Sequence, residues 1–279
     1  MNAAFNRRRW INTIAFAITG CCALLTLGVL FFILGYVAVH GITSLSWNFF
    51  TKLPAPLGES GGGMANAIVG TLKLIAVAAA IGLPVGVLGG VYLAEYGRKG
   101  AVGFLVRYAA DVINGVPSIV MGIFAYTIVV LPMKHFSTLA GGVALGIMLI
   151  PVAVRSTEEF LRLVPTAIRE AGLALGLPQW KVILRLVIPT AMKGLLTGVL
   201  LNLSRGAGET APLLFTAFGN LYWSHGWLNP TASLPVMVYT YAVSPYADWH
   251  RQAWAAALVL LMIVLATNVC ARVIMRKQA

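Results

Sequence analysis

Long apolar runs separated by short polar or basic stretches dominate this sequence. A helix that crosses a bilayer needs about 20 consecutive, mostly apolar residues, and six runs approach or exceed that length. The pattern predicts spans at 14–39, 65–93, 108–131, 139–154, 194–215 and 253–271. We therefore expect an all-α polytopic membrane protein with six transmembrane helices.

Glycine and proline modify two of the predicted spans. In the second span, Gly82, Gly86 and Gly90 recur every four residues. One face of that helix is therefore nearly bare backbone, and another helix can pack closely on it, within this chain or at a subunit interface. In the third span, Gly115 and Pro117 predict a bent or broken helix.

Basic residues indicate which segments face the cytoplasm. Most of the 20 lysines and arginines fall before the first predicted span, around 94–107, around 155–193 or after the last span. The excess of positive charge in cytoplasmic loops places these four regions, and with them both termini, inside. The net charge is +12, but the basic residues alternate with apolar runs and do not cluster on one soluble segment. The chain therefore does not resemble a nucleic-acid binder.

Composition agrees with a membrane protein. The chain is 59% hydrophobic and 10% charged, with a mean hydropathy of +0.86, values far from those of a soluble domain. Cys21 and Cys22 are adjacent and Cys270 is distant, which is neither a disulfide framework nor a metal-ligand spacing. We assign the cysteines to packing and expect no metal site.

Three arginines, Arg7, Arg8 and Arg9, precede the first apolar run. A signal peptide or a twin-arginine export signal would also place basic residues there. The run is too long for a signal peptide and no small-residue cleavage site follows it. We interpret it as an uncleaved first span.

The fifth predicted span contains a buried charge. Arg205 lies about twelve residues into it, close to the midplane at about 1.5 Å per residue. An arginine there is unfavourable by on the order of 3 kcal/mol, so it normally faces water or a countercharge. Glu209 follows at i+4 and can share the same helix face. The pair is either a structural ion pair inside the bundle or a mark of the translocation path.

A basic, amphipathic segment at 165–191 interrupts the membrane-like pattern. Pro165 and Pro178 bracket it and predict a short helix at 166–175. Arg169 and Glu170 place charge on that helix, so it should lie at the surface. From the pattern alone it could be a solvated connection between two spans.

The same segment resembles the EAA loop of ABC importer permeases. The resemblance lies in the order Glu170, Ala171, Gly172 and Gly176, followed by Leu186, Ile188 and Pro189. It departs from the family pattern at Gly172, where alanine is usual, and at Leu186 and Ile188, which exchange the usual isoleucine and leucine. The resemblance implies short cytoplasmic helices that dock in a cleft of a separate ATPase subunit.

No phosphate-binding P-loop occurs in the sequence, since no glycine-rich stretch ends in Gly-Lys-Ser or Gly-Lys-Thr. We therefore expect no catalytic site and no cofactor in this chain. ATP and its magnesium belong to a partner chain.

Several further segments resemble the PstA-type permeases of the phosphate-specific ABC importer. They are GVYLAEYGRKG at 90–100, VPSIVMGIFAYTIVV at 116–130, IPVAVRSTEEFLRLVP at 150–165, LSRGAGETAPLLFTAFGN at 203–220 and SPYADWHRQAWA at 244–255. PstC-type permeases share the Gly208 to Thr210 part, but the continuation APLLFTA favours the PstA type.

This resemblance implies a type I ABC importer permease with the MetI-like fold in the bacterial inner membrane. Its expected partners are a PstC-type permease as the other half of a heterodimer, two PstB-type ATPase subunits, a PstS-type phosphate-binding protein and membrane lipid. It also implies that Arg155 and Arg205 are functionally important arginines. A guanidinium suits a tetrahedral oxyanion because it offers a fork of donors and stays charged, while Glu209 would prevent binding so tight that the anion is trapped.

The expected organisation follows from the spans and the resemblance. A cytoplasmic N-terminus (1–11) precedes the first transmembrane helix with an outer loop (12–64). The MetI-like permease domain (65–275) contains the coupling loop at 165–191 and an outer loop at 216–252, and a cytoplasmic C-terminus (276–279) follows.

Three other functions fit parts of the pattern. A permease for another oxyanion, such as molybdate or sulfate, would share the docking loop but not necessarily the Arg205 segment. A passive channel or proton-coupled carrier, or a purely sensory membrane subunit, would not need ATPase docking, so the 165–191 segment argues against both as sole functions.

Overall fold

The computed structural model describes residues 2–56, 59, 61–97 and 100–277. Among these residues the regular structure is helical, apart from one isolated bridge between Pro54 and Gly62, and the predicted all-α class is confirmed. The helices are α1 (Asn2–Ser44), α2 (Trp47–Thr51), α3 (Ala65–Glu95), α4 (Ala101–Gly115), α5 (Ser118–Ala125), the π-helical η1 (Tyr126–Val130), α6 (Leu131–Met133), α7 (Thr138–Arg162), α8 (Thr166–Ala174), α9 (Gln179–Val182), the π-helical η2 (Ile183–Val187), α10 (Ile188–Ala207), α11 (Ala211–Thr216), α12 (Leu234–Ala242) and α13 (Ala247–Lys277).

Within the described residues, five helices are long and apolar enough to cross a membrane, and the count is six if one bent pair forms a single span. The bent pair is Ala101–Gly115 with Ser118–Met133, which meet at 103°. The break that Gly115 and Pro117 predict is therefore confirmed. The span begins at Ala101 and not at 108, as the hydropathy had indicated.

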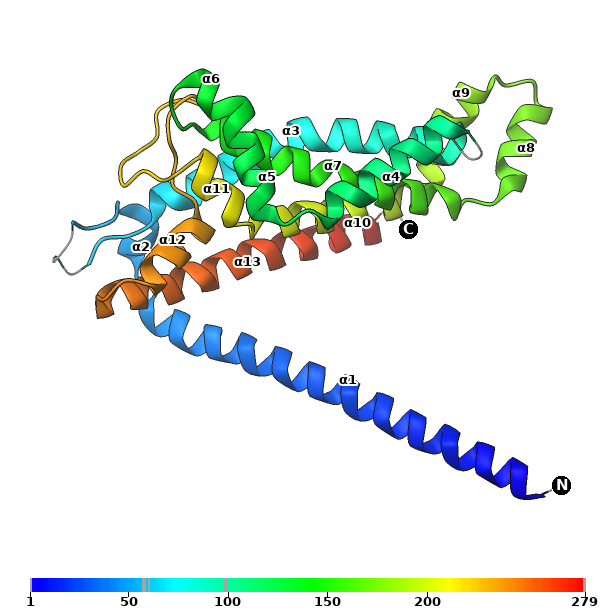
Figure 1. The fold of residues 1–279 in the computed structure, drawn as a ribbon, viewed down its shortest axis with the longest axis horizontal. Coiled ribbons are helices and arrows are strands. Elements are labelled where there is room, and N and C mark those ends of the chain that lie inside the picture. The colour runs from blue at the N-terminus through cyan, green and yellow to red at the C-terminus, as the bar shows by residue number, and fades with distance from the viewer. Residues whose placement is uncertain (1, 57–58, 60, 98–99, 278–279) are drawn as a thin grey trace.

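The centre of the bundle is the pair α3 and α7, which lie side by side along the long axis (Figure 1). A Cβ added at Gly86 would lie 2.3 Å from the Cβ of Ala153, and one added at Gly90 would lie 2.5 Å from the Cβ of Thr157. Only glycine permits this approach, because real Cβ atoms do not come so close. The glycine face predicted in the second span packs inside this chain, on α7.

Helix α1 diverges from the bundle (Figure 1). It contacts α13 near its own carboxyl end, where the ring centroids of Tyr36 and Trp254 lie 5.3 Å apart. Cys21 and Cys22 are exposed, so assigning them to packing within this chain was wrong; Cys270 lies outside the described side chains. A long apolar helix with no neighbour along most of its length suits lipid or a second subunit.

The fifth span differs from the prediction. A continuous helix runs from Gln179 to Ala207 through α9, η2 and α10, so it begins fifteen residues before 194. Lys181 and Arg185 had made this part look like a loop. Pro189 has no N–H to donate to a carbonyl of the preceding turn. The π-helical turn η2, directly before α10, accommodates the proline without ending the helix.

The expected outer loop at 216–252 contains a helix. In α12 the residues Leu234, Val236, Met237 and Tyr241 are buried, and the ring of Tyr241 stacks on that of Trp249 with centroids 4.2 Å apart. Helix α13 already begins at Ala247. Nine residues are too few for a hydropathy signal of a span, which is why the pattern missed α12.

The two ends of the bundle differ. Helices α8 and α9 lie at one end of the long axis, and the first residues of α1 and the last residues of α13 point toward that end (Figure 1). Helices α2 and α12 lie at the other end. Arg98 and Lys99, expected in a basic turn, lie outside the described residues, as do the side chains of Arg272, Arg276 and Lys277.

Candidate translocation site and coupling surface

A cavity of about 260 Å³ lies where the break between α4 and α5 faces α7 and the end of α10. Its apolar wall consists of residues such as Met121, Leu145, Met148, Leu149 and Val152. Its polar side chains are Asn114, Ser118, Asn202, Arg205 and Glu209. An apolar pocket with a few convergent polar groups is the usual form of a small-ligand site.

The local sequence creates this space. Val116 is extended (φ −73°, ψ 132°) because the residue before a proline avoids the helical region, and Pro117 then caps α5. On the opposite side, α10 ends at Ala207 with Gly208 as its C-cap. Two interrupted helices therefore face each other across the cavity.

The structure places Arg205 and Glu209 at the same cavity, but not as the helical pair that their spacing predicted. Arg205 lies in the last turn of α10, near the end of the span and not near its middle. Glu209 follows the end of the helix, so the i+4 geometry does not apply. In the described part of the chain no ion pair joins the two, and both side chains remain available at the cavity.

Asn202 contributes a buried amide to the cavity wall, which the sequence analysis did not identify. Its exposed fraction is 2%, and its Nδ2 donates to the backbone oxygen of Leu149 at 2.9 Å. Its Oδ1 is buried without a hydrogen-bond partner. Asn202 precedes Arg205 by three residues on α10, so the two lie on the same face of the helix.

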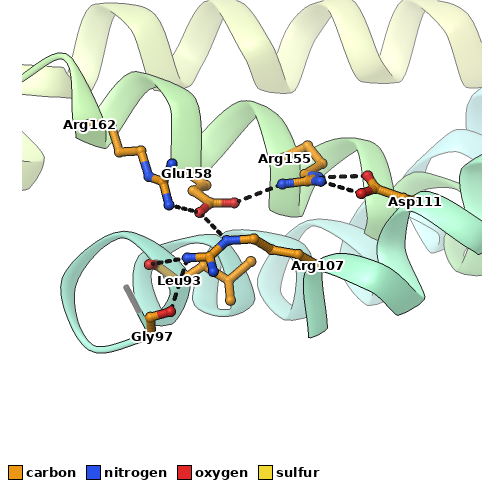
Figure 2. Close-up of polar contacts among 7 residues, drawn as sticks. All are labelled: Leu93, Gly97, Arg107, Asp111, Arg155, Glu158 and Arg162. Carbon is orange, nitrogen blue, oxygen red and sulfur yellow. Dashed lines mark hydrogen bonds and ion pairs between the residues drawn. The ribbon is translucent and has the colours of Figure 1, made fainter. Parts of the chain in front are cut away.

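Arg155, the other predicted path residue, is not among the described residues that line this cavity. It lies on α7 and donates from Nε to Oδ1 of Asp111 at 2.8 Å, with a second bond to Oδ2 (Figure 2). It also reaches Oε2 of Glu158 at 3.3 Å. The Arg155 side chain is 34% exposed and that of Asp111 56%, so this fork remains open to solvent.

Glu158 is the centre of this polar cluster (Figure 2). Its side chain is 2% exposed and accepts from Arg107 at 2.7 Å, from Arg162 at 2.6 Å and from Arg155. Arg107 also donates to the backbone oxygens of Leu93 and Gly97. The sequence analysis missed Glu158. Its i−3 and i+4 arginines were visible in the sequence, but Arg107 lies 51 positions away on α4.

The predicted docking helix forms as α8 at the polar end of the bundle. Of its proposed coupling residues, Glu170, Ala171, Gly176 and Pro189 are exposed, whereas Gly172 is buried. A Cβ at Gly172 would lie 2.8 Å from Cδ1 of Leu186 and 2.9 Å from Cγ2 of Val182. The departure from alanine at this position therefore lets α8 pack closely on the start of the fifth span.

Gly176 ends α8. Its φ of +77° is in the left-handed region, its N–H donates to the oxygen of Leu173, and the N–H of Leu177 donates to the oxygen of Gly172. These two bonds form a Schellman motif, in which glycine is preferred. The glycine at position 176 is therefore explained by the way in which α8 ends.

Arg169 fixes α8 to α3. Its guanidinium pairs with Glu95, with 2.6 Å between Nη2 of Arg169 and Oε1 of Glu95, and the two side chains are 12% and 4% exposed. It also donates to the oxygens of Val164 and Leu161 at 2.7 and 2.8 Å. The sequence analysis placed Arg169 on this helix but missed its partner.

Within the described residues, no group of three or more histidines, cysteines, aspartates or glutamates gathers where it could hold a metal ion.

Comparisons with known proteins agree with this arrangement. Residues 86–278 match the family model described as "Binding-protein-dependent transport system inner membrane component". The chain is 44% identical to "Phosphate transport system permease protein PstA" of Yersinia pestis, over 97% of this chain and 92% of that one. It is 39% identical to "Probable phosphate transport system permease protein PstA" of Methanocaldococcus jannaschii, over 89% and 88%.

Among solved structures, the fold resembles the chain described as "Inward facing conformations of the MetNI methionine ABC transporter: CY5 native crystal form". The TM-score is 0.62 at 19% identity, and the match covers 77% of this chain and 97% of that chain. Similarity at this level of identity supports the fold, and the predicted MetI-like permease fold is confirmed.

Proposed function

The chain belongs to the binding-protein-dependent transport system inner membrane components, and within them to the PstA phosphate permeases, and from this membership we propose that it forms half of a path that carries inorganic phosphate into the cell. The chain is a membrane subunit, and we expect ATP hydrolysis to take place in a partner chain. The names of its relatives favour phosphate over molybdate or sulfate.

The observation that carries the proposal is the cavity at the ends of two interrupted helices, where Arg205 and Glu209 lie without pairing. Arg205 supplies a permanent positive charge and a fork of donors for an oxyanion. Glu209 offsets part of that charge, so the anion binds and leaves. A path for transport needs weak sites, since a site that binds too tightly stops the flow.

We place Arg155 on the same route, at its polar end. Its guanidinium is a third exposed and is held by Asp111, which is itself exposed. An anion that reaches this fork competes with Asp111 for the same donors, because carboxylate and phosphate accept from arginine in the same geometry.

The second proposed element is ATPase coupling through α8. Leu173 and Leu175, on and directly after α8, are 50% and 81% exposed at the polar end of the bundle. Exposed apolar side chains outside the membrane indicate a partner surface. Because Arg169 pairs with buried Glu95, a force applied to Glu170 and Ala171 on α8 would reach α3 and the bundle.

The assembly that completes this chain follows from the proposal. A PstC-type permease would supply the other half of the path, two PstB-type subunits would bind and hydrolyse ATP with magnesium, and a PstS-type protein would deliver phosphate from outside. Figure 1 supports a topology with the start of α1, the end of α13 and α8 on the cytoplasmic side of the inner membrane, since these segments lie toward one end. The exposed apolar length of α1 is suited to lipid and to the second permease.

Uptake of labelled phosphate tests the proposal. Cells without their own high-affinity system would carry this chain with its companions, as wild type, as Glu170→Arg and as Glu159→Arg, a control at another exposed glutamate. We expect uptake in wild type and in Glu159→Arg, and loss in Glu170→Arg at equal membrane levels. Wild-type cells that import only another oxyanion would contradict the substrate, and uptake by Glu170→Arg would contradict the coupling surface.

A further inference from the structure

The break between α4 and α5 carries two polar side chains, one on each side of Pro117. Asn114 is the last residue but one of α4, Ser118 is the first residue of α5, and both line the cavity together with Arg205. Within the described part of the chain, neither side chain makes a hydrogen bond. Asn114 is exposed, and the Oγ of half-buried Ser118 is not among the buried polar atoms. The amide and the hydroxyl are therefore open to a ligand.

The other polar side chains of the cavity offer few donors to an anion. Asn202 donates its Nδ2 to a backbone oxygen of α7 at 2.9 Å, and its Oδ1 is buried, so this amide is closed to a ligand. The carboxylate of Glu209 only accepts when it is ionised. The side-chain donors that remain among the described lining residues are the guanidinium of Arg205, the amide of Asn114 and the hydroxyl of Ser118.

A tetrahedral oxyanion needs donors from more than one direction. The fork of Arg205 binds two of its oxygens, and the other oxygens point away from that fork. A second cation would hold them too tightly for transport, whereas neutral donors satisfy them without adding charge. The cavity volume of about 260 Å³ is several times the roughly 30 Å³ that one water occupies, so a hydrated tetrahedral anion fits.

We propose that Asn114 and Ser118 bind phosphate in this cavity, by donating to the oxygens that the fork of Arg205 leaves free. The proposal rests on the proposed function, and it names the neutral half of the anion site. The bound anion would then connect the end of α10 with the break between α4 and α5, so both interrupted helices would contact the substrate.

The test uses the assembled permease and ATPase complex without the binding protein. Cys21, Cys22 and Cys270 are replaced by serine, and Val152→Cys, on α7 at the cavity wall, reports occupancy through its rate of reaction with a thiol reagent. Labelling of this chain is followed by mass spectrometry while inorganic phosphate is titrated at constant ionic strength. Met148→Cys, one turn away on α7, is a second reporter. Protection is expressed relative to each variant's own rate without phosphate.

We expect phosphate to slow labelling in the reporter complex. Asn114→Leu and Ser118→Ala should each raise the half-protecting concentration about tenfold, as the loss of one hydrogen bond to a charged acceptor implies. Ser118→Thr, which keeps the hydroxyl, should stay close to the parent. Asn114→Asp, which is nearly the same size as the parent residue, should raise the concentration more than Asn114→Leu, because a carboxylate repels the anion.

A merely structural role for the two residues would not give this order of effects. Asn12→Leu, the same change at an exposed position of α1, is the matched control and should leave the half-protecting concentration unchanged. An unchanged concentration in either Asn114→Leu or Ser118→Ala would overturn the inference, as would the absence of protection in the reporter complex.

Phosphate uptake by the wild-type importer, with the binding protein added, is measured in vesicles in parallel. If that uptake is present while phosphate does not protect, or protects the variants equally, the inference fails and the proposed function stands. If wild-type vesicles take up no phosphate, the proposed function fails and the inference fails with it.

Discussion

Glu158 of α7 accepts a hydrogen bond from Nε of Arg107 on α4 at 2.7 Å, with only 2% of its side chain exposed. Arg162 and Arg155 reach the same carboxylate. Because Arg107 also holds the oxygens of Leu93 and Gly97, one buried acid ties together α4, α7 and the end of α3. Helix α4, the first helix of the bent pair beside the cavity, is therefore held in place by this cluster.

Neutralising this acid should destabilise the protein. Glu158→Gln leaves Arg107, Arg155 and Arg162 without their common countercharge, and removing one partner of a buried ion pair typically costs about 3–5 kcal/mol. Thermal unfolding of the purified chain in detergent measures the effect. Glu159→Gln, at the exposed neighbour, should change stability by less than about 0.5 kcal/mol. Equal melting of the two variants would show that the cluster does not hold the helices together.

Replacing Arg169 should separate ATP hydrolysis from transport. Arg169→Lys keeps the charge but loses the fork that reaches Glu95 and two backbone oxygens at once. We expect the assembled complex to keep most of its ATPase activity while phosphate uptake per ATP falls severalfold. Arg185→Lys, at an exposed position of η2, is the matched control and should keep both. Parallel loss of hydrolysis and uptake in Arg169→Lys would point to failed docking.

The close approach of α3 and α7 should not tolerate a methyl group at its centre. Gly86→Ala would place a Cβ 2.3 Å from that of Ala153, and overpacking of this kind costs about 1–3 kcal/mol. Gly20→Ala on α1 has nothing within 4 Å and should leave the melting temperature unchanged or raised, since alanine favours helix. If both variants melt alike, the glycine face is not a tight contact.

Asp111 should regulate how Arg155 meets a passing anion. Asp111→Asn removes the charge that occupies the exposed fork, so Arg155 should bind phosphate more tightly and release it more slowly. The expected result is a lower phosphate concentration for half-maximal uptake together with a lower maximal rate. Asp248→Asn, which breaks a comparable exposed pair with Arg251 on α13, should change neither value. Unchanged kinetics in Asp111→Asn would remove Arg155 from the proposed route.

Local sequence was sufficient for some of these features. Hydropathy placed α3 within two residues of its observed end, Gly115 and Pro117 marked the break, and Pro165 and Pro178 bracketed α8. Each of these signals lies within a few residues of the feature that it specifies. The fold class and the position of helix α8 were therefore accessible before the structure.

Other features depend on contacts between distant segments. The fifth span was started too late because Lys181 and Arg185 are polar enough to suggest a loop. The neighbouring Val182, Ile183 and Val187 are nevertheless buried. The partner of Arg169 lies 74 positions away at Glu95. Arg205 and Glu209 were expected as a helical pair from their spacing, and the significance of Gly208 between them as the C-cap of α10 was missed. Such relationships require the tertiary arrangement.

The most direct test of the central claim is phosphate uptake by the complete importer with Arg205→Gln, compared with Lys193→Gln on the same helix. Lys193 is exposed and is not among the described residues that line the cavity. With equal amounts of assembled complex, we predict that Arg205→Gln reduces uptake at least tenfold and that Lys193→Gln keeps it near the wild-type rate. Wild-type uptake by Arg205→Gln would contradict a phosphate path through this cavity.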